Sequence, residues 1–414
     1  MNEEALENLT MAWFGDLGYQ TAFGPDILDE RGDVTEVILW KRFEAALERV
    51  NPGIPSSLLN QAILQFRRSL TQEADQIRCN RLFQTLLIEG IPIQHREGAS
   101  TKTVIVKLVD RYNPDANDWL AVNQVEVWNE SNHRIPDIVV YLNGLPISVF
   151  ELKTFANEEV YLVNGFKQLQ TYKKEIPQLF LTNEILVVSN GQYARLGSLT
   201  AGWDRFMPWR VLEGSADAAE RYTMELEIML YDLFNHENLL EYIHDYILFL
   251  DSRSSPAKII AGYHQSHAAR SAFLRTLEEV EKEGRGKIGV VWHTQGSGKS
   301  LTMAFLTGLI VRDTEKLQNP TVLVITDRKD LDGQLFGTFG AAREFLRQEP
   351  ERIENKDDLI ARLSGRQYGG IIFSTIQKFL PKVKEEMMGI LSDRSNIIVM
   401  ADEAHRSQYD FLDG

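Results

Sequence analysis

The sequence of 414 residues predicts an α/β protein with two successive regions of mixed helices and strands. Short β-rich runs gather between residues 102 and 153, and helical patterns precede and follow them. Beyond residue 258, apolar strand-like runs alternate with helical patterns, which indicates a parallel sheet covered by helices. Hydrophobic residues make up 43% of the chain, enough for two or three substantial cores.

The first region is predicted to begin with helices and to continue with strands. Its apolar residues recur at helical spacing at first, and a Pro and Gly break separates the first two helical patterns. In chain order we expect helices at 36–50, 56–70 and 78–90, strands at 102–109, 123–128, 136–142 and 146–153, a helix at 163–175 and a strand at 184–191.

The second region follows a helical tract at 224–250 and a polar, Pro-containing stretch at 251–258 that is typical of a linker. Strand-like runs are expected at 287–294, 321–327, 369–375 and 395–401. The pattern therefore predicts three parts: a domain over 1–220, a helical connector and linker over 221–258, and a second domain over 259–414.

Composition limits the class of protein. The single cysteine, Cys79, cannot form an internal disulfide and suggests a reducing compartment. The acidic start "MNEEALENLT" lacks the features of a signal peptide, and no apolar run reaches the roughly 18 residues of a membrane span. We expect a cytoplasmic protein. The net charge of −15 argues mildly against a nucleic-acid partner, although a local basic surface can lie on an acidic protein.

The stretch "PDIVVYLNGLPISVFELKT", residues 136–154, predicts a β-hairpin with three charged residues at one end. Asn-Gly between two apolar runs is a strong hairpin signal, because both turn residues need a positive φ. Alternation places Glu151 and Lys153 on the same face of the second strand. The first strand brings Asp137 near them across the hairpin.

Two carboxylates that face one point form a hard-oxygen site for Mg²⁺, which polarises a phosphodiester and helps to generate hydroxide from water. A neighbouring lysine can orient that water or stabilise charge on the phosphate. Asp137, Glu151 and Lys153 are spaced as in the PD-(D/E)xK nuclease superfamily, which they resemble. Solvated charges at the end of an edge strand are the alternative reading.

Gln168 and Tyr172 lie four residues apart on the predicted helix at 163–175, and therefore on one of its faces. Their position after the second strand resembles the Gln-x-x-x-Tyr element of RecB-type nucleases. That resemblance implies that both side chains line the approach to the metal. An ordinary helix face is the alternative reading.

The loop "HTQGSGKS", residues 293–300, follows a predicted strand and precedes an apolar helix, which is the context of a phosphate-binding loop. Its backbone N–H groups would close around the phosphates, Lys299 would reach the β- and γ-phosphates, and Ser300 would coordinate Mg²⁺. The remaining residues that we expect to hold ATP in the loop are Thr294, Gly296, Ser297 and Gly298. His293 replaces the usual first glycine, as in loops of superfamily 2 helicases, which this loop resembles.

The run "IIVMADEAHRS", residues 397–407, resembles the DEAH-box form of helicase motif II. The resemblance implies that Asp402 holds the Mg²⁺ of ATP, that Glu403 is the catalytic base and that His405 links to the nucleic-acid side. Before the loop, Gln265 is positioned to read adenine as a Q-motif does, with a surface glutamine as the alternative.

A nuclease motif followed by a DEAH motor, with the wording "RIPDIVVYLNGLPISVFELKT" and "VVWHTQGSGKSLTM", resembles the restriction (R) subunit of type I restriction–modification enzymes. The resemblance implies a PD-(D/E)xK nuclease-like α/β domain followed by a RecA-like parallel α/β motor domain. It also implies ATP and Mg²⁺ as cofactors, double-stranded DNA as substrate, and modification (methyltransferase) and specificity subunits as partners.

Two alternatives stay open at this point. One is another nuclease–helicase fusion, RecB-like or from a phage, and the other is a non-catalytic DNA-binding remnant. The sequence stops at Gly414, soon after the DEAH motif, whereas R subunits continue into a second RecA-like lobe. We therefore expect a truncated subunit that binds ATP weakly and does not turn it over.

Overall fold

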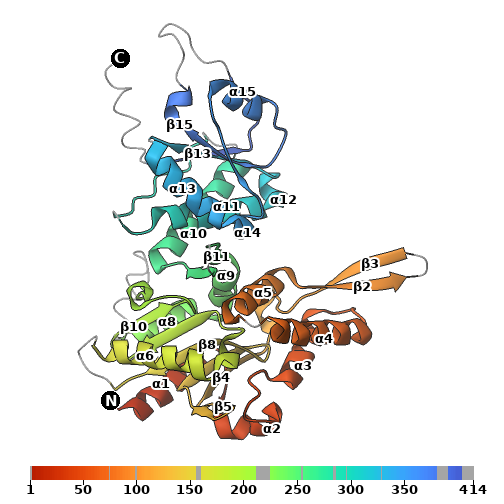
Figure 1. The fold of residues 1–414 in the computed structure, drawn as a ribbon, viewed down its shortest axis with the longest axis vertical. Coiled ribbons are helices and arrows are strands. Elements are labelled where there is room, and N and C mark those ends of the chain that lie inside the picture. The colour runs from red at the N-terminus through yellow and green to blue at the C-terminus, as the bar shows by residue number, and fades with distance from the viewer. Residues whose placement is uncertain are drawn as a thin grey trace. The chain divides into compact units, whose positions relative to one another are not determined.

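The computed structural model describes residues 2–73, 75–97, 100–154, 160–210, 224–252, 255–282, 286–294, 296–327, 329–379 and 390–402. Its backbone forms two compact units (Figure 1). Unit 1 comprises Met1–Ile247 and Arg253–Tyr263, and unit 2 comprises Leu248–Ser252 and His264–Gly414. Among the described helices, none is long and apolar enough to cross a bilayer.

Unit 1 is built on a six-stranded sheet of order β1-β4-β7-β8-β9-β10. Its strands are β1 (Gln20–Phe23), β4 (Trp119–Asn123), β7 (Ile138–Leu142), β8 (Leu145–Leu152), β9 (Ile185–Ser189) and β10 (Ala194–Gly197). The pairs β1–β4 and β8–β9 are parallel and the others antiparallel. All eight residues of β8 are buried, so this strand is covered on both faces.

Helices cover both faces of this sheet, and the alternation along β8 identifies which helix lies on which face. The Phe150 ring packs edge-on against Phe14 of α1 (Glu3–Asp16), with ring centroids 5.6 Å apart. The next residue, Glu151, faces Gly165 of α6 (Val160–Glu175). Because successive side chains point to opposite faces, α1 and α6 lie on opposite sides of the sheet.

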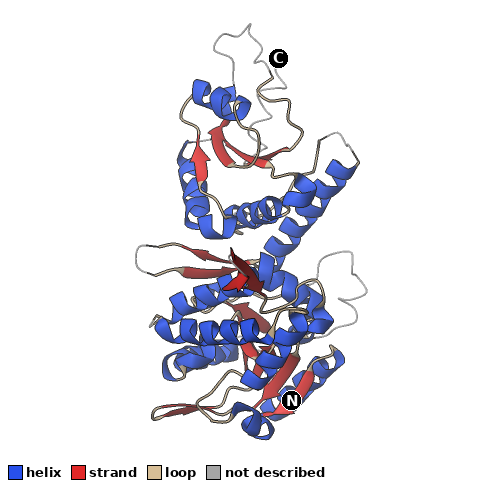
Figure 2. Cartoon of the chain, turned by 90° about the vertical axis from the view of Figure 1, so that its right-hand side faces the viewer, coloured by secondary structure: helices blue, strands red, loops and turns tan. Residues whose placement is uncertain are grey.

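The remaining helices of unit 1 support this layered core (Figure 2). An aromatic cluster formed by Trp40, Phe43, Phe66 and Phe83 joins three of them. The six remaining helices described in this unit are α2 (Leu28–Arg31), α3 (Trp40–Val50), α4 (Ser56–Gln72), α5 (Gln76–Glu89), α8 (Glu225–Leu233) and α9 (His236–Asp245). The 3₁₀ turns are η1 (Gly24–Ile27), η2 (Pro114–Ala116), η3 (Pro177–Phe180) and η4 (Trp203–Arg205). Small two-stranded sheets in this unit pair β2 (Ile91–Glu97) with β3 (Ser100–Val106) and β5 (Val127–Asn129) with β6 (Asn132–Arg134). The strands β11 (Ile247–Leu250) and β12 (Ala257–Ile260) form a further two-stranded sheet.

Unit 2 contains a four-stranded sheet in which every pair is parallel, as the alternating pattern predicts. Its order is β14 (Pro350–Arg352), β15 (Ile371–Thr375), β13 (Thr321–Thr326) and β16 (Ile397–Ala401). Neighbouring residues of β13, Val322 and Leu323, belong to two separate hydrophobic clusters, so both faces are buried. The helices are α10 (Tyr263–Glu281), α11 (Lys299–Arg312), α12 (Thr314–Leu317), α13 (Lys329–Ala341), α14 (Arg343–Leu346) and α15 (Lys356–Ser364), with the 3₁₀ turn η5 (Ile376–Phe379).

Two sequence-based predictions of local structure are wrong. The run at 287–294 forms no strand, and Val290 and Trp292 are 89% and 94% exposed. A strand needs a hydrogen-bonded neighbour, and an apolar run alone does not supply one. The end of the predicted helical tract, Ile247–Leu250, forms the strand β11, since a short apolar run fits either structure.

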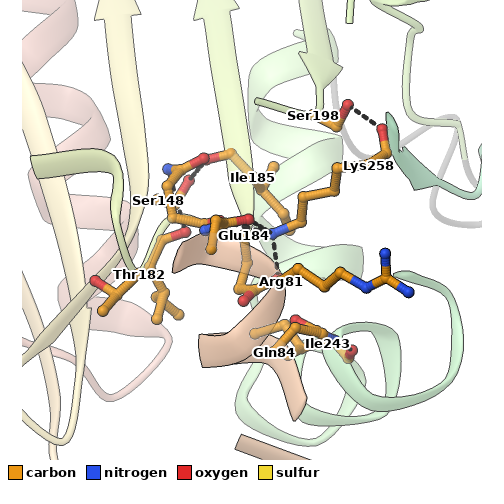
Figure 3. Close-up of polar contacts among 12 residues, drawn as sticks. Arg81, Gln84, Ser148, Thr182, Glu184, Ile185, Ser198, Ile243 and Lys258 are labelled. Carbon is orange, nitrogen blue, oxygen red and sulfur yellow. Dashed lines mark hydrogen bonds and ion pairs between the residues drawn. The ribbon is translucent and has the colours of Figure 1, made fainter. Parts of the chain in front are cut away.

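Lys258, which the composition places in a linker, is instead fully buried in a polar cluster of unit 1 (Figure 3). Its Nζ lies 2.7 Å from Oε2 of Glu184, 2.7 Å from the carbonyl oxygen of Asn183 and 2.9 Å from Oδ1 of Asn80. All three ammonium donors therefore have acceptors. Burial lowers the pKa of Lys258 and raises that of Glu184 to about 7, and each group opposes the shift of the other.

Lys258→Met should destabilise unit 1 by about 3–5 kcal/mol, because it leaves the Glu184 carboxyl buried without its counter-ion. The double variant Lys258→Met/Glu184→Leu should recover much of this loss, since no charge remains to be buried. Calorimetric melting of both variants measures the difference. A free energy of unfolding of Lys258→Met within about 0.5 kcal/mol of the wild-type value would contradict this prediction.

The hairpin turn between β7 and β8 yields a second prediction. Asn143 and Gly144 have φ values of 52° and 75°, as the Asn-Gly signal predicts. A Cβ at Gly144 would lie 2.5 Å from the carbonyl oxygen of Leu39. Gly144→Ala should therefore lower the free energy of unfolding more than Gly53→Ala does. Gly53 is the matched control, because it has a φ of 87° and open space around it. Its replacement carries only the roughly 1–2 kcal/mol of backbone strain. Equal melting temperatures for the two variants would show that the close approach to Leu39 is immaterial.

Candidate functional site

The β7–β8 hairpin places two acidic side chains at one end of the sheet of unit 1. Ile138 pairs with Phe150 in the antiparallel register, so the next position outward sets Asp137 opposite Glu151. Residues directly opposite in an antiparallel pair project from the same face. Oδ2 of Asp137 accepts a hydrogen bond of 2.6 Å from the backbone N–H of Leu152, which fixes its carboxylate at the strand end.

Lys153 completes this cluster. Its ammonium group donates to Oε1 of Glu151 and to the carbonyl oxygen of Leu152, the latter at 3.0 Å. The backbone N–H of Lys153 donates to Ser189 of β9 at 2.8 Å, so the end of β8 is held by its parallel neighbour. The structure thus brings together the three charged residues that the sequence singles out.

The helix α6 covers Glu151 from the other side. A Cβ at Gly165 would lie 3.4 Å from Cγ of Glu151, so the small residue lets the helix approach the strand closely. Nε2 of Gln168 donates to the hydroxyl oxygen of Tyr172 at 2.6 Å, and the Tyr172 ring is buried. Burial raises the pKa of Glu151, and the hydroxyl group of Tyr172 opposes that rise. Both predicted helix residues therefore lie at this cluster.

Burial dominates the electrostatics of the cluster. It raises the pKa of Glu151 to about 8, with a further increase from the negative charge of Asp137, and Lys153 opposes the shift. Burial likewise raises the pKa of Asp137 to about 6, while the hydrogen bond from Leu152 opposes it. Two carboxylates that resist losing their protons mark a place where an added positive charge is strongly favoured.

The donor set suits a divalent cation with oxygen ligands. Oε2 of Glu151 is buried and has no hydrogen-bond partner within the described residues, although a buried carboxylate oxygen normally has one. Asp137 supplies the second carboxylate, and Mg²⁺ is commonly held by one or two of them. In the described parts of the chain no three His, Cys, Asp or Glu side chains gather into a larger metal-binding group.

Two further acidic residues near this cluster have almost no signal in the sequence. Glu3 and Glu7, one turn apart on α1, both raise the pKa of Asp137. Oε1 of Glu3 also accepts a hydrogen bond of 3.2 Å from the backbone N–H of Thr154. Their i, i+4 spacing is the only local signal, because the contact joins residues about 150 positions apart. The carboxylate of Glu36 is occupied locally, since its Oε1 accepts hydrogen bonds from the backbone N–H groups of Val37 and Ile38.

The predicted phosphate-binding loop lies at the start of α11 in unit 2. Gly296 and Gly298 have φ values of 82° and 81°, a conformation that glycine adopts without strain. Ser297 turns back on Thr294, donating to its carbonyl oxygen from the backbone N–H at 3.3 Å and from Oγ at 2.7 Å. Lys299 and Ser300 form the first turn of α11 and are partly exposed.

Gln265 lies on α10 beside this loop. Its Nε2 is 3.2 Å from the carbonyl oxygen of Ser297 and 3.3 Å from that of Gly298. The neighbouring His264 places Nε2 3.0 Å from the same Ser297 oxygen. The amide that the sequence assigns to adenine thus contacts the loop backbone here.

Asp402 follows β16 directly. Because β13, β15 and β16 are parallel, their carboxyl ends meet at one edge of the sheet, and ligands of open α/β sheets bind at such an edge. The backbone N–H of Asp402 donates to Ile325 of β13 at 2.8 Å. Glu403 and His405 lie outside the described residues, so their predicted roles stay predictions.

Comparisons with known proteins agree with this two-part organisation. Residues 1–205 match the family model of the type I restriction enzyme R protein N terminus, and residues 264–413 match that of the SWI2/SNF2 ATPases. The chain is 40% identical over 419 residues to the type I restriction enzyme HindI endonuclease subunit of Haemophilus influenzae, covering 99% of this chain and 39% of that protein.

Similar relatives occur in other organisms. The putative type I restriction enzyme MjaIXP endonuclease subunit of Methanocaldococcus jannaschii is 35% identical, covering all of this chain and 41% of the relative. The SauMSSORF170P endonuclease subunit of Staphylococcus aureus is 25% identical over 99% of this chain and 40% of its own length. The chain spans about two fifths of the length of these relatives. It belongs to the family of R proteins of type I restriction enzymes.

Proposed function

We propose that this chain carries the nuclease and the ATP-binding motor region of a type I restriction enzyme. The complete enzyme would couple ATP-driven translocation of double-stranded DNA to Mg²⁺-dependent cleavage of unmodified DNA. The observation that carries the proposal is the fully buried Glu151 opposite the partly buried Asp137, with Lys153 beside them at the end of β8. The relatives described above are endonuclease subunits, which supports the same interpretation.

In the proposed nuclease, a PD-(D/E)xK-like domain, Asp137 and Glu151 would hold Mg²⁺, with the unpartnered Oε2 of Glu151 as one ligand. A bound Mg²⁺ polarises the phosphodiester and lowers the pKa of its water. Lys153, held on Glu151, would stabilise the charge that develops on the phosphate or orient the attacking water. Tyr172, positioned by Gln168, would keep the Glu151 carboxylate in place on the side of α6.

In the proposed motor, the loop before α11 would bind ATP. Lys299 would reach the β- and γ-phosphates, and Ser300 and Asp402 would hold the accompanying Mg²⁺. Glu403 would act as the base that activates the attacking water. Thr294, Gly296, Ser297 and Gly298 would surround the phosphates, and Gln265 would contact the nucleotide side of the loop.

The partners of the complete enzyme would be modification and specificity subunits, in the cytoplasm. A RecB-like or phage fusion is less well supported, because the relatives reported above are type I endonuclease subunits. A non-catalytic remnant differs from the proposal in one measurable respect. Metal-dependent cleavage that Glu151→Ala abolishes is expected of the enzyme and not of a remnant.

Mg²⁺ affinity should rise with pH between about 6 and about 8. The pKa values of Asp137 and Glu151 are about 6 and about 8, so below these values the carboxyls carry protons that a cation must displace. Calorimetric titration of the 414-residue chain with Mg²⁺, in buffers of different ionisation enthalpy, measures both the affinity and the protons released.

Glu151→Gln should remove most of this binding and its proton release. Glu36→Gln is the matched control: it neutralises a carboxylate that contacts its own backbone, and it should leave the titration unchanged. Mg²⁺ binding that is independent of pH and insensitive to Glu151→Gln would place the cation elsewhere.

The nuclease and motor activities should be separable by mutation, because their residues lie in different units. In the full-length enzyme with its partner subunits, Lys153→Ala should abolish cutting and leave DNA-stimulated ATP hydrolysis intact. Lys299→Ala should abolish both, since cutting in the family follows translocation. Parallel assays of phosphate release and DNA cleavage test this, and normal cutting by Lys299→Ala at saturating ATP would refute the coupling.

A further inference from the structure

Strands β2 and β3 form a two-stranded ribbon, residues 91–106, that projects from the rest of unit 1 (Figure 1). At its base Ile91, Ile93 and Val106 are buried. Farther out the described side chains are exposed on both faces; they are Gln94, His95, Arg96, Ser100, Thr101, Lys102 and Thr103. The outer ribbon therefore contributes nothing to the core.

An isolated two-stranded ribbon is only marginally stable in water, and its two open edges invite pairing with other chains. Here the outer part contains no large apolar side chain between Gln94 and Thr103. Its order is thus not explained by burial. A ligand that binds the formed ribbon and not the unfolded segment would stabilise it.

The charge of this part of the chain is opposite to that of the whole. Residues 56–107 contain seven Lys and Arg against four Asp and Glu, whereas the full chain has a net charge of −15. On the ribbon, Arg96 lies opposite Thr101, and Lys102 lies opposite His95. Because these two pairs are adjacent in the register, they project from opposite faces, so each face presents a strong cation. At its base, the ribbon packs on α4, where Arg67 and Arg68 are exposed.

These features suit a DNA groove. The major groove of B-DNA admits a two-stranded β-ribbon, with phosphates along both of its walls. Lys, Arg and hydroxyl side chains are common donors to phosphate oxygens, which position a protein without reading sequence. We propose that the ribbon is an arm that binds double-stranded DNA, with Arg96 and Lys102 contacting phosphates on the two sides of a groove. The choice of DNA as ligand rests on the proposed function.

The test measures binding of the 414-residue chain to a fluorescein-labelled duplex of about 30 base pairs by fluorescence anisotropy over a range of salt concentrations. Arg96→Ala/Lys102→Ala should lower the slope of log affinity against log salt by about 2 and weaken binding about tenfold or more at low salt. A second variant replaces residues 95–102 by Asn-Gly, which joins the cross-strand partners Gln94 and Thr103 through a tight turn. It should lose the same binding and keep the melting temperature of wild type.

Lys41→Ala/Arg205→Ala is the matched control, since it removes two exposed cations of unit 1 outside the ribbon and should bind as wild type does. The proposal is overturned if both ribbon variants bind the duplex with wild-type affinity and salt slope, or if they lose binding to a partner subunit only. Mg²⁺ titration of the same samples separates this outcome from failure of the proposed function. Loss of DNA binding with unchanged Mg²⁺ binding supports the arm, whereas absence of Glu151-dependent Mg²⁺ binding contradicts the nuclease alone.

Discussion

Unit 1 depends on the burial of one acidic side chain, Glu151, near the end of the inner strand β8 of its sheet. A buried carboxylate without compensation costs several kcal/mol, so the surrounding elements must offset that cost. Lys153 supplies a counter-charge, Tyr172 a hydroxyl group that favours the ionised carboxylate, and Gly165 the space for α6 to cover the site. Even so, the pKa of Glu151 stays raised, which means that the protein alone does not satisfy this group. The fold therefore maintains a place where a bound cation would be favoured, which is the electrostatic basis of the proposed Mg²⁺ site.

The sequence predicted this site because its main determinants are local. The Asn-Gly turn determines the hairpin, and the hairpin sets Asp137 opposite Glu151. Helical spacing places Gln168 and Tyr172 on one face. The same reasoning could not find Glu3 and Glu7, whose contact with the site depends on how α1 packs across the sheet. Long-range contacts of this kind leave almost no signal in a single sequence.

Two predictions of local structure were wrong for a related reason. The run at 287–294 has the apolar character of a strand, yet strand formation depends on a pairing partner that composition does not reveal. Lys258 stands in a polar stretch that resembles a linker, and only its buried contact with Glu184 shows that it belongs to a core. In both cases the apolar or polar character of the residues is plain from the sequence, but the residues that they contact could not be predicted. The parallel strands of unit 2 could be predicted because strands buried on both faces are apolar throughout.

The return of Arg253–Tyr263 to unit 1 has a consequence for biosynthesis. The backbone leaves this unit after Ile247, contributes five residues to unit 2, and comes back before leaving again. The lysine that neutralises Glu184 is therefore synthesised more than seventy residues after it. Domains fold as units while the chain emerges from the ribosome, at roughly 5–20 residues per second. For several seconds the nascent unit 1 would hold the side chain of Glu184 in its interior without a counter-ion, and Glu184 would retain a proton until Lys258 emerges. The final step in folding of unit 1 would thus coincide with the start of synthesis of unit 2.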